Sequence, residues 1–496
     1  MFKKINYLRL FNAVFLCLFI YILFEVLFNE YSIYWTEQNT GLLVVGVILS
    51  LCIILFLSKI LKKLSEKGLC YAIGCSMIAI LGLQILFAIN FKVNPTWDFG
   101  IIYNEAISMI QGNPISHYFY DYYPNNIGVL ILYNGVFKVC NLLGITNYLN
   151  ILIIINIILI DSSIVALLYL IKKLYTLRIV ALLSIIMVFI TPFYCYVTIV
   201  YTDTLTMIFP ILSFLLYYNI SQSEDLVFKK KAVYIVCIGI LLTIGAIIKM
   251  NVIITLAAML IHSFFTQKNK QFFVFALIML SCFIGLNKFY SYQVEKIIPI
   301  PYGEAGLPPT HWVMMGLKDN GRYNLDEAKF SISLKDLGYS KERIREENLS
   351  IIKSRITDYG VLGMIDHIRE KIDFTWGDGT YYSIDKLRRE PLNTNILQPY
   401  VFGEKMGSFI MFNQIVHIIV LIGIILCAVS NLYNITPIST VANITIFGVV
   451  LFLLIWETRS RYLVLYIPIL LLSMIHGYQF LCDLVIRKEN KELENE

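Results

Sequence analysis

Long apolar runs are the feature that most constrains the fold of this 496-residue chain. Many of them reach or approach the roughly 20 residues that a helix needs to cross about 30 Å of hydrocarbon. The mean hydropathy is +0.71 and only 15% of the residues are charged, which excludes a soluble globular protein. The ten-residue alternation typical of a transmembrane β-barrel is absent from the sequence. The sequence therefore predicts an all-α polytopic membrane protein.

Twelve membrane spans are predicted. The first is interpreted as an uncleaved span, because its apolar run is too long for a signal peptide and no small-residue cleavage site follows it. The predicted spans are 8–28, 41–60, 70–91, 148–171, 177–198, 203–219, 232–248, 250–266, 271–290, 407–430, 437–456 and 461–482.

Lysine and arginine clusters predict that both termini are cytoplasmic. With twelve spans, the clusters of the connecting segments and the tail fall on the same side as Lys3, Lys4 and Arg9. This parity requires that residues 127–144 do not cross, so we expect a helix lying at the outer interface there. The alternative is a true span at this position, compensated by a misassigned span elsewhere. The clusters are Lys62-Lys63, Lys172-Lys173, Lys229 to Lys231, Lys268 with Lys270, and Arg487-Lys488.

Composition divides the chain into four predicted parts. These are an N-terminal transmembrane hairpin (1–69), a transmembrane core (70–290) with a first outer loop (92–147), an extracellular loop domain (291–405), and C-terminal helices with a cytoplasmic tail (406–496). Only the loop domain has the composition of a soluble domain. The ten cysteines are scattered, without a CxxC or Cys/His cluster, so the sequence predicts neither zinc nor disulfides.

The motif NPTWDFG, residues 94–100, puts Asp98 beside aromatic residues at a predicted outer membrane boundary. Apolar surroundings disfavour the ionised form of a carboxylate and can make it a useful base; helix capping is the alternative. Glu105 would share a helical face with Asp98. The following segment HYFYDYYPNN offers Asp121, Tyr123 and Asn125. Its aromatic and polar side chains suit carbohydrate, and the same composition describes an interfacial aromatic belt.

Further charged residues lie at predicted outer boundaries. Asp203, in VYTDTLTM, lies between nearly uncharged spans, where an ionisable residue indicates function; an N-cap role also fits this position. Lys249, in GAIIKMN, suits either a phosphate contact or snorkelling to the interface. Arg459 and Arg461, in WETRSRYL, oppose the usual charge bias of outer segments and suit bidentate phosphate binding. A structural pair with Glu457 is the alternative there.

These motifs together resemble the GT-C membrane glycosyltransferases, specifically glycosyltransferase family 39, the protein O-mannosyltransferase-like group. The resemblance covers most of residues 70–465 and depends on the order TWDFG, YPNN, YTDT, GAIIKMN and ETRSRYL. The segments HWVMMGL with GRYN (311–324) and TWGDGTYY (375–382) resemble the outer loop of a Gram-positive bacterial subset. His311 and Trp312 in the first of these segments are accordingly expected to bind substrate.

The resemblance implies a GT-C fold and transfer of a sugar from a polyprenyl-phosphate-sugar donor to an acceptor outside the membrane, with inversion of the anomeric centre. By this analogy Asp98 deprotonates the acceptor hydroxyl, and Asp203 orients substrate or a cation. Phe99 follows Asp98 where the eukaryotic mannosyltransferases have a second acidic residue, which favours a cell-wall glycopolymer over a surface protein as acceptor. The residues implied to bind the lipid phosphate are Lys249, Arg459 and Arg461.

Two other functions stay open. A transporter or flippase for lipid-linked sugars would need charges within spans, of which Asp161 is the clear example. A glycan polymerase or ligase with diphosphate-linked donors would use the same loop and arginines. No Walker A, GxGxxG or HExxH pattern supports nucleotide hydrolysis or zinc peptidase chemistry. No metal site is predicted, although a divalent cation held by Asp203 with Glu105 or Asp121 is left open.

The expected location is the cell membrane, with the active site on the extracellular face. The expected partners are the polyprenyl-phosphate-linked donor, an extracellular glycan or protein acceptor and membrane lipid, and no nucleic acid.

Overall fold

The computed structural model describes residues 2–28, 39–222 and 228–495, which are mostly helical. Ten segments of this described part are long and apolar enough to cross a membrane. They are α1 (Phe2–Phe28), α2 (Thr40–Lys63), α3 (Glu66–Asn90), α6 (Tyr148–Leu174), α9 (Thr202–Leu205) with α10 (Ile208–Gln222), α11 (Phe228–Ile248), α13 (Asn269–Val294), α19 (Gly407–Tyr433), α20 (Pro437–Ile455), and η5 (Ser460–Tyr466) with α21 (Ile467–Asn495).

Two shorter apolar helices accompany the ten long segments. One is α7 (Leu177–Met187), which the single turn α8 (Pro192–Cys195) follows, and the other is α12 (Ile253–Thr266), which η3 (Met250–Val252) precedes. Each of the twelve predicted spans therefore coincides with a helical segment, and the prediction of an all-α polytopic membrane protein is confirmed. The connections at 29–38, inside the predicted N-terminal hairpin, and at 223–227 lie outside the described residues.

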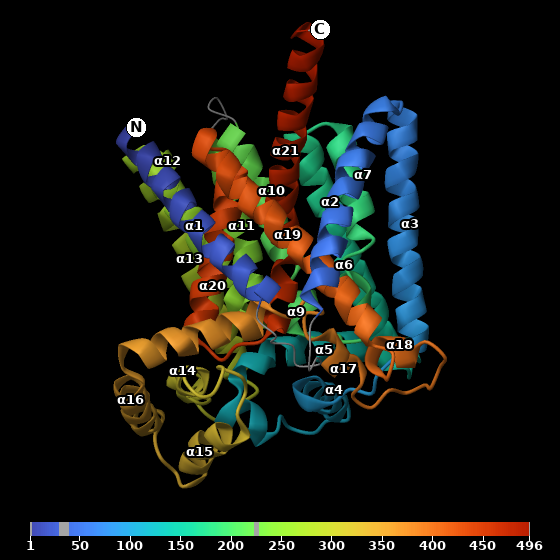
Figure 1. Cartoon of the computed structure of the whole chain (residues 1–496). Coiled ribbons are helices and arrows are strands. Elements are labelled where there is room, and N and C mark those ends of the chain that lie inside the picture. Colours follow the sequence, from blue (N-terminus) through green and yellow to red (C-terminus); the bar gives the residue numbers. More distant parts are fainter. Residues whose placement is uncertain (1, 29–38, 223–227, 496) are drawn as a thin grey trace.

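The remaining helices form a layer across one end of the bundle, here called the loop layer, and both ends of the chain lie at the opposite end (Figure 1). Residues 127–144, predicted not to cross, contain the sixteen-residue helix α5, which is not among the candidate spans and lies in this layer. The elements of the loop layer are α4 (Trp97–Ile110), η1 (Tyr118–Tyr122), η2 (Pro124–Asn126), α5 (Ile127–Leu142), η4 (Tyr302–Glu304), α14 (Thr310–Gly316), α15 (Leu325–Asp336), α16 (Lys341–Trp376), α17 (Ser383–Leu387) and α18 (Gln398–Phe402).

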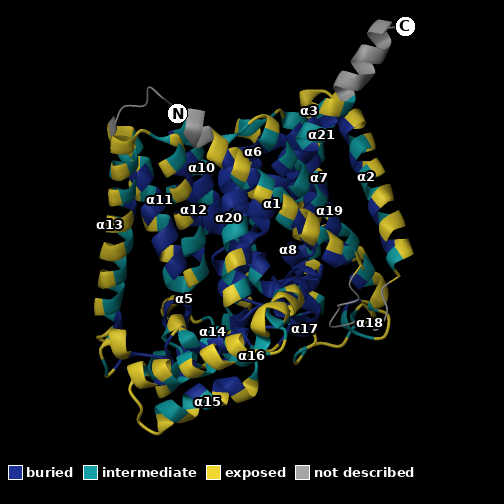
Figure 2. Cartoon of the chain, turned by 60° about the vertical axis from the view of Figure 1, so that its left-hand side comes forward, coloured by how far each residue is buried: buried dark blue, intermediate teal, exposed yellow. Residues whose placement is uncertain are grey.

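The spans differ sharply in how much of their surface other helices cover (Figure 2). In the most apolar part of each span, 89% of the residues of the last span are buried, but only 17% in α2, 22% in α3 and 11% in α13. Leucine, isoleucine and phenylalanine side chains point outward on these peripheral helices, as expected where lipid replaces water.

Close contact between α19 and α21 depends on two glycines. A β-carbon on Gly477 would lie 2.0 Å from the carbonyl oxygen of Gly423. Small residues at such positions let two helix backbones approach closely, which favours association in a membrane, where burying apolar surface gives little advantage.

The first helix is part of this core. Phe15 and Phe19 of α1 are fully buried, and the ring of Phe19 lies 5.5 Å from that of Trp376 at the end of α16. The buried amide of Asn443 in α20 donates to Asn12 Oδ1 at 3.0 Å. The start of the chain is thus joined to its last spans by apolar packing and by an amide hydrogen bond.

Candidate active site

Asp98 lies in the first turn of α4, and the backbone around it is tightly constrained. Trp97 has a φ of 47°, in the left-handed region that non-glycine residues rarely adopt. A β-carbon on Gly100 would lie 2.5 Å from the carbonyl oxygen of Pro95, so the turn has no room for a larger residue. Strained backbone of this kind persists where the surrounding structure holds it, and it is common at functional sites.

Two tyrosine hydroxyls hold the carboxylate of Asp98. Tyr118 donates to Oδ1 at 3.0 Å and Tyr201 donates to Oδ2 at 3.3 Å. Burial and the negative charge of Asp98 raise the pKa of Tyr118, so its hydroxyl keeps the hydrogen that it donates. The N-cap of α4 is Thr96 and no side chain caps this helix, so the capping alternative does not describe Asp98.

Asp203, Lys249 and Arg461 form a buried ion-pair triad. Asp203 Oδ1 lies 2.6 Å from Lys249 Nζ, and its Oδ2 lies 3.4 Å from Arg461 Nε. All three side chains are at most 10% exposed. The N-cap of α9 is Tyr201, so the capping alternative for Asp203 is wrong. The snorkelling alternative for Lys249 is wrong as well, because its ammonium group is buried against a carboxylate.

The two arginines of the ETRSRYL motif pair with carboxylates, and one of their guanidinium nitrogens remains without a partner among the described residues. Arg459 Nε lies 3.3 Å from Glu457 Oε1, which is the structural pair considered as the alternative. The Nε of Arg461 likewise faces Asp203 at 3.4 Å, and neither Nε has hydrogen-bond geometry. Nη1 of Arg461 is buried and has neither a hydrogen-bond nor an ion-pair partner among the described residues. Buried, unsatisfied donors on a charged group are unfavourable unless a ligand accepts from them. Arg461 Nη1 is therefore a candidate to bind an anion.

Aromatic rings surround the basic groups. The guanidinium of Arg461 lies 4.8 Å from the ring of Trp97 and 5.3 Å from that of Tyr201, whose hydroxyl reaches Asp98. The guanidinium of Arg459 lies 5.3 Å from the ring of Tyr382. Tyr201 thus stands between the carboxylate of Asp98 and the triad, which makes one continuous site.

Lys386 is a residue of this site that the sequence interpretation did not include. It lies on α17, is only 3% exposed, and its Nζ lies 3.8 Å from the centre of the Trp97 ring. Within the described part of the chain no ion pair joins it to a carboxylate. Burial, followed by the charge of Arg461, lowers the pKa of Lys386 to about 5. Its position shortly after the motif TWGDGTYY is the only signal in the sequence that points to it.

Hydrogen bonds from backbone and side-chain groups join residues 321–382 to the ETRSRYL segment. Thr458 donates its N–H to the carbonyl of Gly321 at 2.8 Å, and Ser460 donates its hydroxyl to Asp378 at 2.7 Å. Asp378 also accepts from the backbone N–H of Tyr382 at 2.8 Å.

A lysine of α16 adds a further contact. Lys371 donates to the carbonyl oxygen of Trp456 at 2.8 Å. These contacts fix the second resembling segment, residues 375–382, beside the two arginines.

A further aromatic group connects Asp98 to the predicted residues of α14. The ring of Tyr123 lies 5.1 Å from that of Tyr118 and 6.4 Å from the rings of His311 and Trp312. Trp312 stacks on Trp456 at 5.4 Å. Burial lowers the pKa of His311 to about 4, so its imidazole is neutral at pH 7.

The other predicted residues of the first outer loop have contacts elsewhere. Glu105 accepts from the backbone N–H of Ser116 at 2.6 Å, a contact that folds the loop itself. Asp121 is half-buried on η1, and Asn125 is exposed. Asn126, which the sequence interpretation passed over, is buried and accepts from the hydroxyl of Tyr201 at 3.1 Å. The position after the predicted asparagine is therefore the one that reaches the Asp98 site.

No group of three or more His, Cys, Asp or Glu side chains is placed to hold a metal ion within the described ranges. Asp203, considered above as a ligand for a divalent cation, is already paired with two basic side chains.

Replacing Lys386 with methionine is expected to raise the thermal stability of the protein while impairing the function of the site. An unfolded lysine has a pKa of about 10.4, whereas that of Lys386 is about 5. Between these pH values the unfolded chain binds a proton that the folded chain lacks, so wild-type stability falls as pH is lowered from 10 to 6. The melting temperature of Lys386→Met should exceed that of wild type at pH 6, and the difference should shrink at pH 9.5.

Lys329→Met, at an exposed position of α15, is the matched control and should show no such pH-dependent gain. A melting temperature of Lys386→Met below that of wild type at pH 6 would contradict this account of the buried lysine.

The long apolar helices define a polytopic, all-helical integral membrane protein. Residues 2–479 match the model of a family described as conserved hypothetical integral membrane proteins, and the chain belongs to this family. The solved apo structure of the oligosaccharyltransferase of Archaeoglobus fulgidus is similar over 86% of this chain and 52% of its own, with a TM-score of 0.48 and 12% identity. The chain thus spans about half the length of that protein. Among curated proteins no match was found.

Proposed function

We propose that this protein is a membrane glycosyltransferase that transfers a sugar from a polyprenyl-phosphate-linked donor to a hydroxyl of an extracellular acceptor. The observation that carries the proposal is the position of Asp98 beside a group of buried basic side chains. Three ion pairs of this group use only two carboxylates, those of Asp203 and Glu457, and Lys386 pairs with none. A phosphate would supply the missing negative charge.

Asp98 is the base of the proposed reaction. Its carboxylate takes the proton of the acceptor hydroxyl as the acceptor oxygen attacks the anomeric carbon of the donor sugar. The bond between that carbon and the phosphate oxygen breaks with inversion, and its electron pair leaves with the polyprenyl phosphate. Two phenol donors hold the carboxylate in position, which supports a defined direction of proton transfer.

The basic side chains stabilise the leaving group. Negative charge on the phosphate grows as its bond to the sugar breaks, and preorganised cations stabilise such developing charge. Arg461 supplies the guanidinium nitrogen Nη1, which has no partner among the described residues, and Arg459 supplies a second guanidinium beside it. Lys386 supplies an amino group that pairs with no carboxylate, and the charge of a bound phosphate would favour its protonated form. Asp203 positions Lys249 and Arg461, which makes it a positioning residue in this scheme.

The aromatic side chains provide the sugar-binding walls. Trp97, Tyr123 and Trp312 lie around the Asp98 site, and aromatic rings suit the C–H faces of a sugar. Phe99, which is buried, follows Asp98 at the position where a second acidic residue is expected for a protein acceptor. We therefore favour a cell-wall glycopolymer as acceptor.

The proposed orientation places both termini in the cytoplasm and the loop layer on the extracellular face, as the lysine and arginine clusters predict. In this arrangement residues 291–405 form the extracellular loop domain, and residues 70–290 and 406–496 supply the spans that carry Asp203, Lys249 and the two arginines.

The test is sugar transfer by the purified protein in detergent. It would be given polyprenyl-phosphate-linked sugars and, in parallel, polyprenyl-diphosphate-linked sugars, each with a cell-wall polymer as acceptor. Product from the monophosphate donors alone supports the proposal, and product from the diphosphate donors alone indicates a polymerase or ligase. A flippase forms no product in detergent with either donor. The glycan composition of cells that lack the protein would identify the sugar.

A further inference from the structure

Helix α16 changes direction at Gly360. This residue has a φ of 56° and a ψ of −164°, a conformation that glycine adopts readily and residues with a β-carbon rarely do. Residues 361–376 form a second helical segment, here called the transverse segment, which runs across the end of the bundle (Figure 1). It contacts α1 and α20. The transverse segment is shorter than the roughly 20 residues that cross a bilayer, so it lies along the bilayer or outside it.

One face of the transverse segment packs against the spans. Ile372 is only 3% exposed and belongs to the apolar core that the spans form, and Ile368 packs against the same core. Ile365 and Val361 precede them at the spacing of three and four residues that keeps side chains on one helical face. These four residues therefore form one apolar stripe, which begins near the kink and ends against the spans.

The half of the stripe near the kink is not covered by the described residues. Val361 is 79% exposed, Ile365 is 58% exposed, and Leu362 beside them is 78% exposed. The span α20, which the transverse segment contacts, is also exposed at its end nearest the loop layer, where Ile455 is its last residue. A group of exposed, large apolar side chains marks a surface that contacts a membrane or another protein. Here the group continues the lipid-facing surface of the spans.

The other faces of the transverse segment fix its orientation. Met364 packs with the apolar cluster of α14, and His367 Nε2 lies 3.0 Å from the carbonyl oxygen of Gly316. This second face therefore points to the loop layer. Asp366 and Glu370 are exposed on a third face. An apolar face next to a charged face is typical of a helix that lies in the membrane interface, with the charged side chains in water.

We infer that the transverse segment is an interfacial helix, and that Val361, Leu362 and Ile365 lie in the lipid at the bilayer surface next to the loop layer. The occupant of the exposed half of the stripe is lipid, because the other half of the same stripe packs against membrane spans. A second copy of the chain or another protein would have to replace lipid at this boundary. The inference does not depend on the proposed transferase activity.

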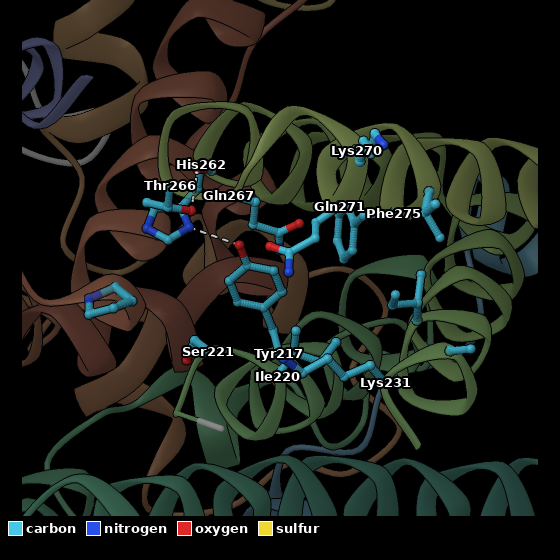
Figure 3. A pocket seen from close by; sticks show the side chains of 14 residues that line it. Tyr217, Ile220, Ser221, Lys231, His262, Thr266, Gln267, Lys270, Gln271 and Phe275 are labelled. Carbon is cyan, nitrogen blue, oxygen red and sulfur yellow. Dashed lines mark hydrogen bonds between the residues drawn. The ribbon is translucent and has the colours of Figure 1, made fainter. Parts of the chain in front are cut away.

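A cavity at the opposite end of the bundle is separate from this surface. It has a volume of about 480 Å³ and lies between α10, α11, α12 and α13, where Tyr217 and His262 share a hydrogen bond (Figure 3). No residue of α16 lines it. Lipid or detergent held in this cavity would not contact residues 361–365, so lipid contacts measured at those positions report the stripe itself.

The experiment is photo-crosslinking of the purified full-length protein in nanodiscs of dioleoylphosphatidylcholine. The photoreactive amino acid p-benzoylphenylalanine replaces Val361 or Ile365 in separate variants, and the mass of the irradiated protein reveals lipid adducts. Leu277, which is 68% exposed on the peripheral span α13, is the positive reference. The adduct yields at 361 and 365 should approach the yield at 277, because an interfacial helix buries its apolar face about 5–10 Å into the leaflet.

Two positions are matched controls. Asp366 lies on the charged face of the same segment, and Leu337 is 73% exposed directly after α15, which lies on the side of the loop layer away from the spans (Figure 1). Both should give roughly tenfold less lipid adduct than position 361, since water surrounds them. Unchanged elution and melting temperature verify that each variant folds, and Leu362 provides a replacement position if one does not.

Three outcomes would overturn the inference. Lipid adducts at 361 and 365 as rare as those at the two control positions would place the stripe in water. Equal, high yields at all four positions would indicate that lipid contacts the whole loop layer without regard to the stripe. An adduct with the mass of a second chain at 361 or 365, in place of the lipid adduct, would assign this face to an interface between copies.

Discussion

Replacing Asp98 with asparagine is expected to lower the rate of sugar transfer by roughly 10²–10⁴-fold, the contribution typical of a general base. Asparagine has nearly the same shape, and its amide oxygen can still accept from one of the hydroxyls of Tyr118 and Tyr201. It cannot take a proton from the acceptor. Donor binding and melting temperature should change little, because the basic side chains remain in place. Single-turnover rates with saturating donor measure the effect.

Asp326→Asn is the matched control, since Asp326 also lies in the first turn of a helix but is exposed on α15. It should keep wild-type transfer. Wild-type turnover by Asp98→Asn would remove Asp98 from the role of base, while comparable losses in both variants would point to a general effect of acidic residues at helix starts.

Replacing Asp203 with asparagine is expected to destabilise the protein by about 3–5 kcal/mol, because it leaves two buried cations without their shared carboxylate. Lys249 and Arg461 are at most 10% exposed and lie within 2.6 and 3.4 Å of the Asp203 oxygens. Neither can move to water without disrupting the packed ends of their spans. Thermal or denaturant unfolding in detergent measures the loss.

The double variant Asp203→Asn/Lys249→Met separates the ion pair from other effects. It should be less destabilised than the sum of the two single variants, because one of the stranded charges is gone. Glu342→Gln provides the contrast: its pair with Arg345 has a 2.8 Å separation but is exposed, and should contribute less than about 1 kcal/mol. Strict additivity of the two single changes would contradict a coupled Asp203–Lys249 pair.

The residues that the sequence interpretation selected at the outer boundaries fall into two groups. Asp203, Lys249 and Arg461 form one buried group, although 258 positions (461 − 203) separate the first from the last. Each was recognisable by itself, because a charge next to a long apolar run is unusual and has few explanations. Glu105 was selected by helical spacing alone, and its carboxylate instead holds the backbone of its own loop.

Lys386 and Asn126 could not be selected in the same way. Both lie in segments with many polar residues, where another lysine or asparagine is unremarkable. Their significance comes from burial: Lys386 lies against the ring of Trp97, and Asn126 accepts from Tyr201. Burial of a residue in a polar loop depends on which distant segment covers it. The local sequence pattern does not show which segment that is.

The sequence by itself determined the membrane class, the twelve helical segments and the segment at 127–144 that is not a candidate span. Apolar length and the distribution of lysine and arginine are local properties, and a bilayer accepts few structures other than long apolar helices. Only the tertiary structure decided how the charges combine. It brought Tyr201 between Asp98 and Arg461, and it placed Lys386 of the loop layer against the ring of Trp97. Contacts of this kind depend on side-chain packing between segments far apart in the chain, which periodicity and composition do not encode.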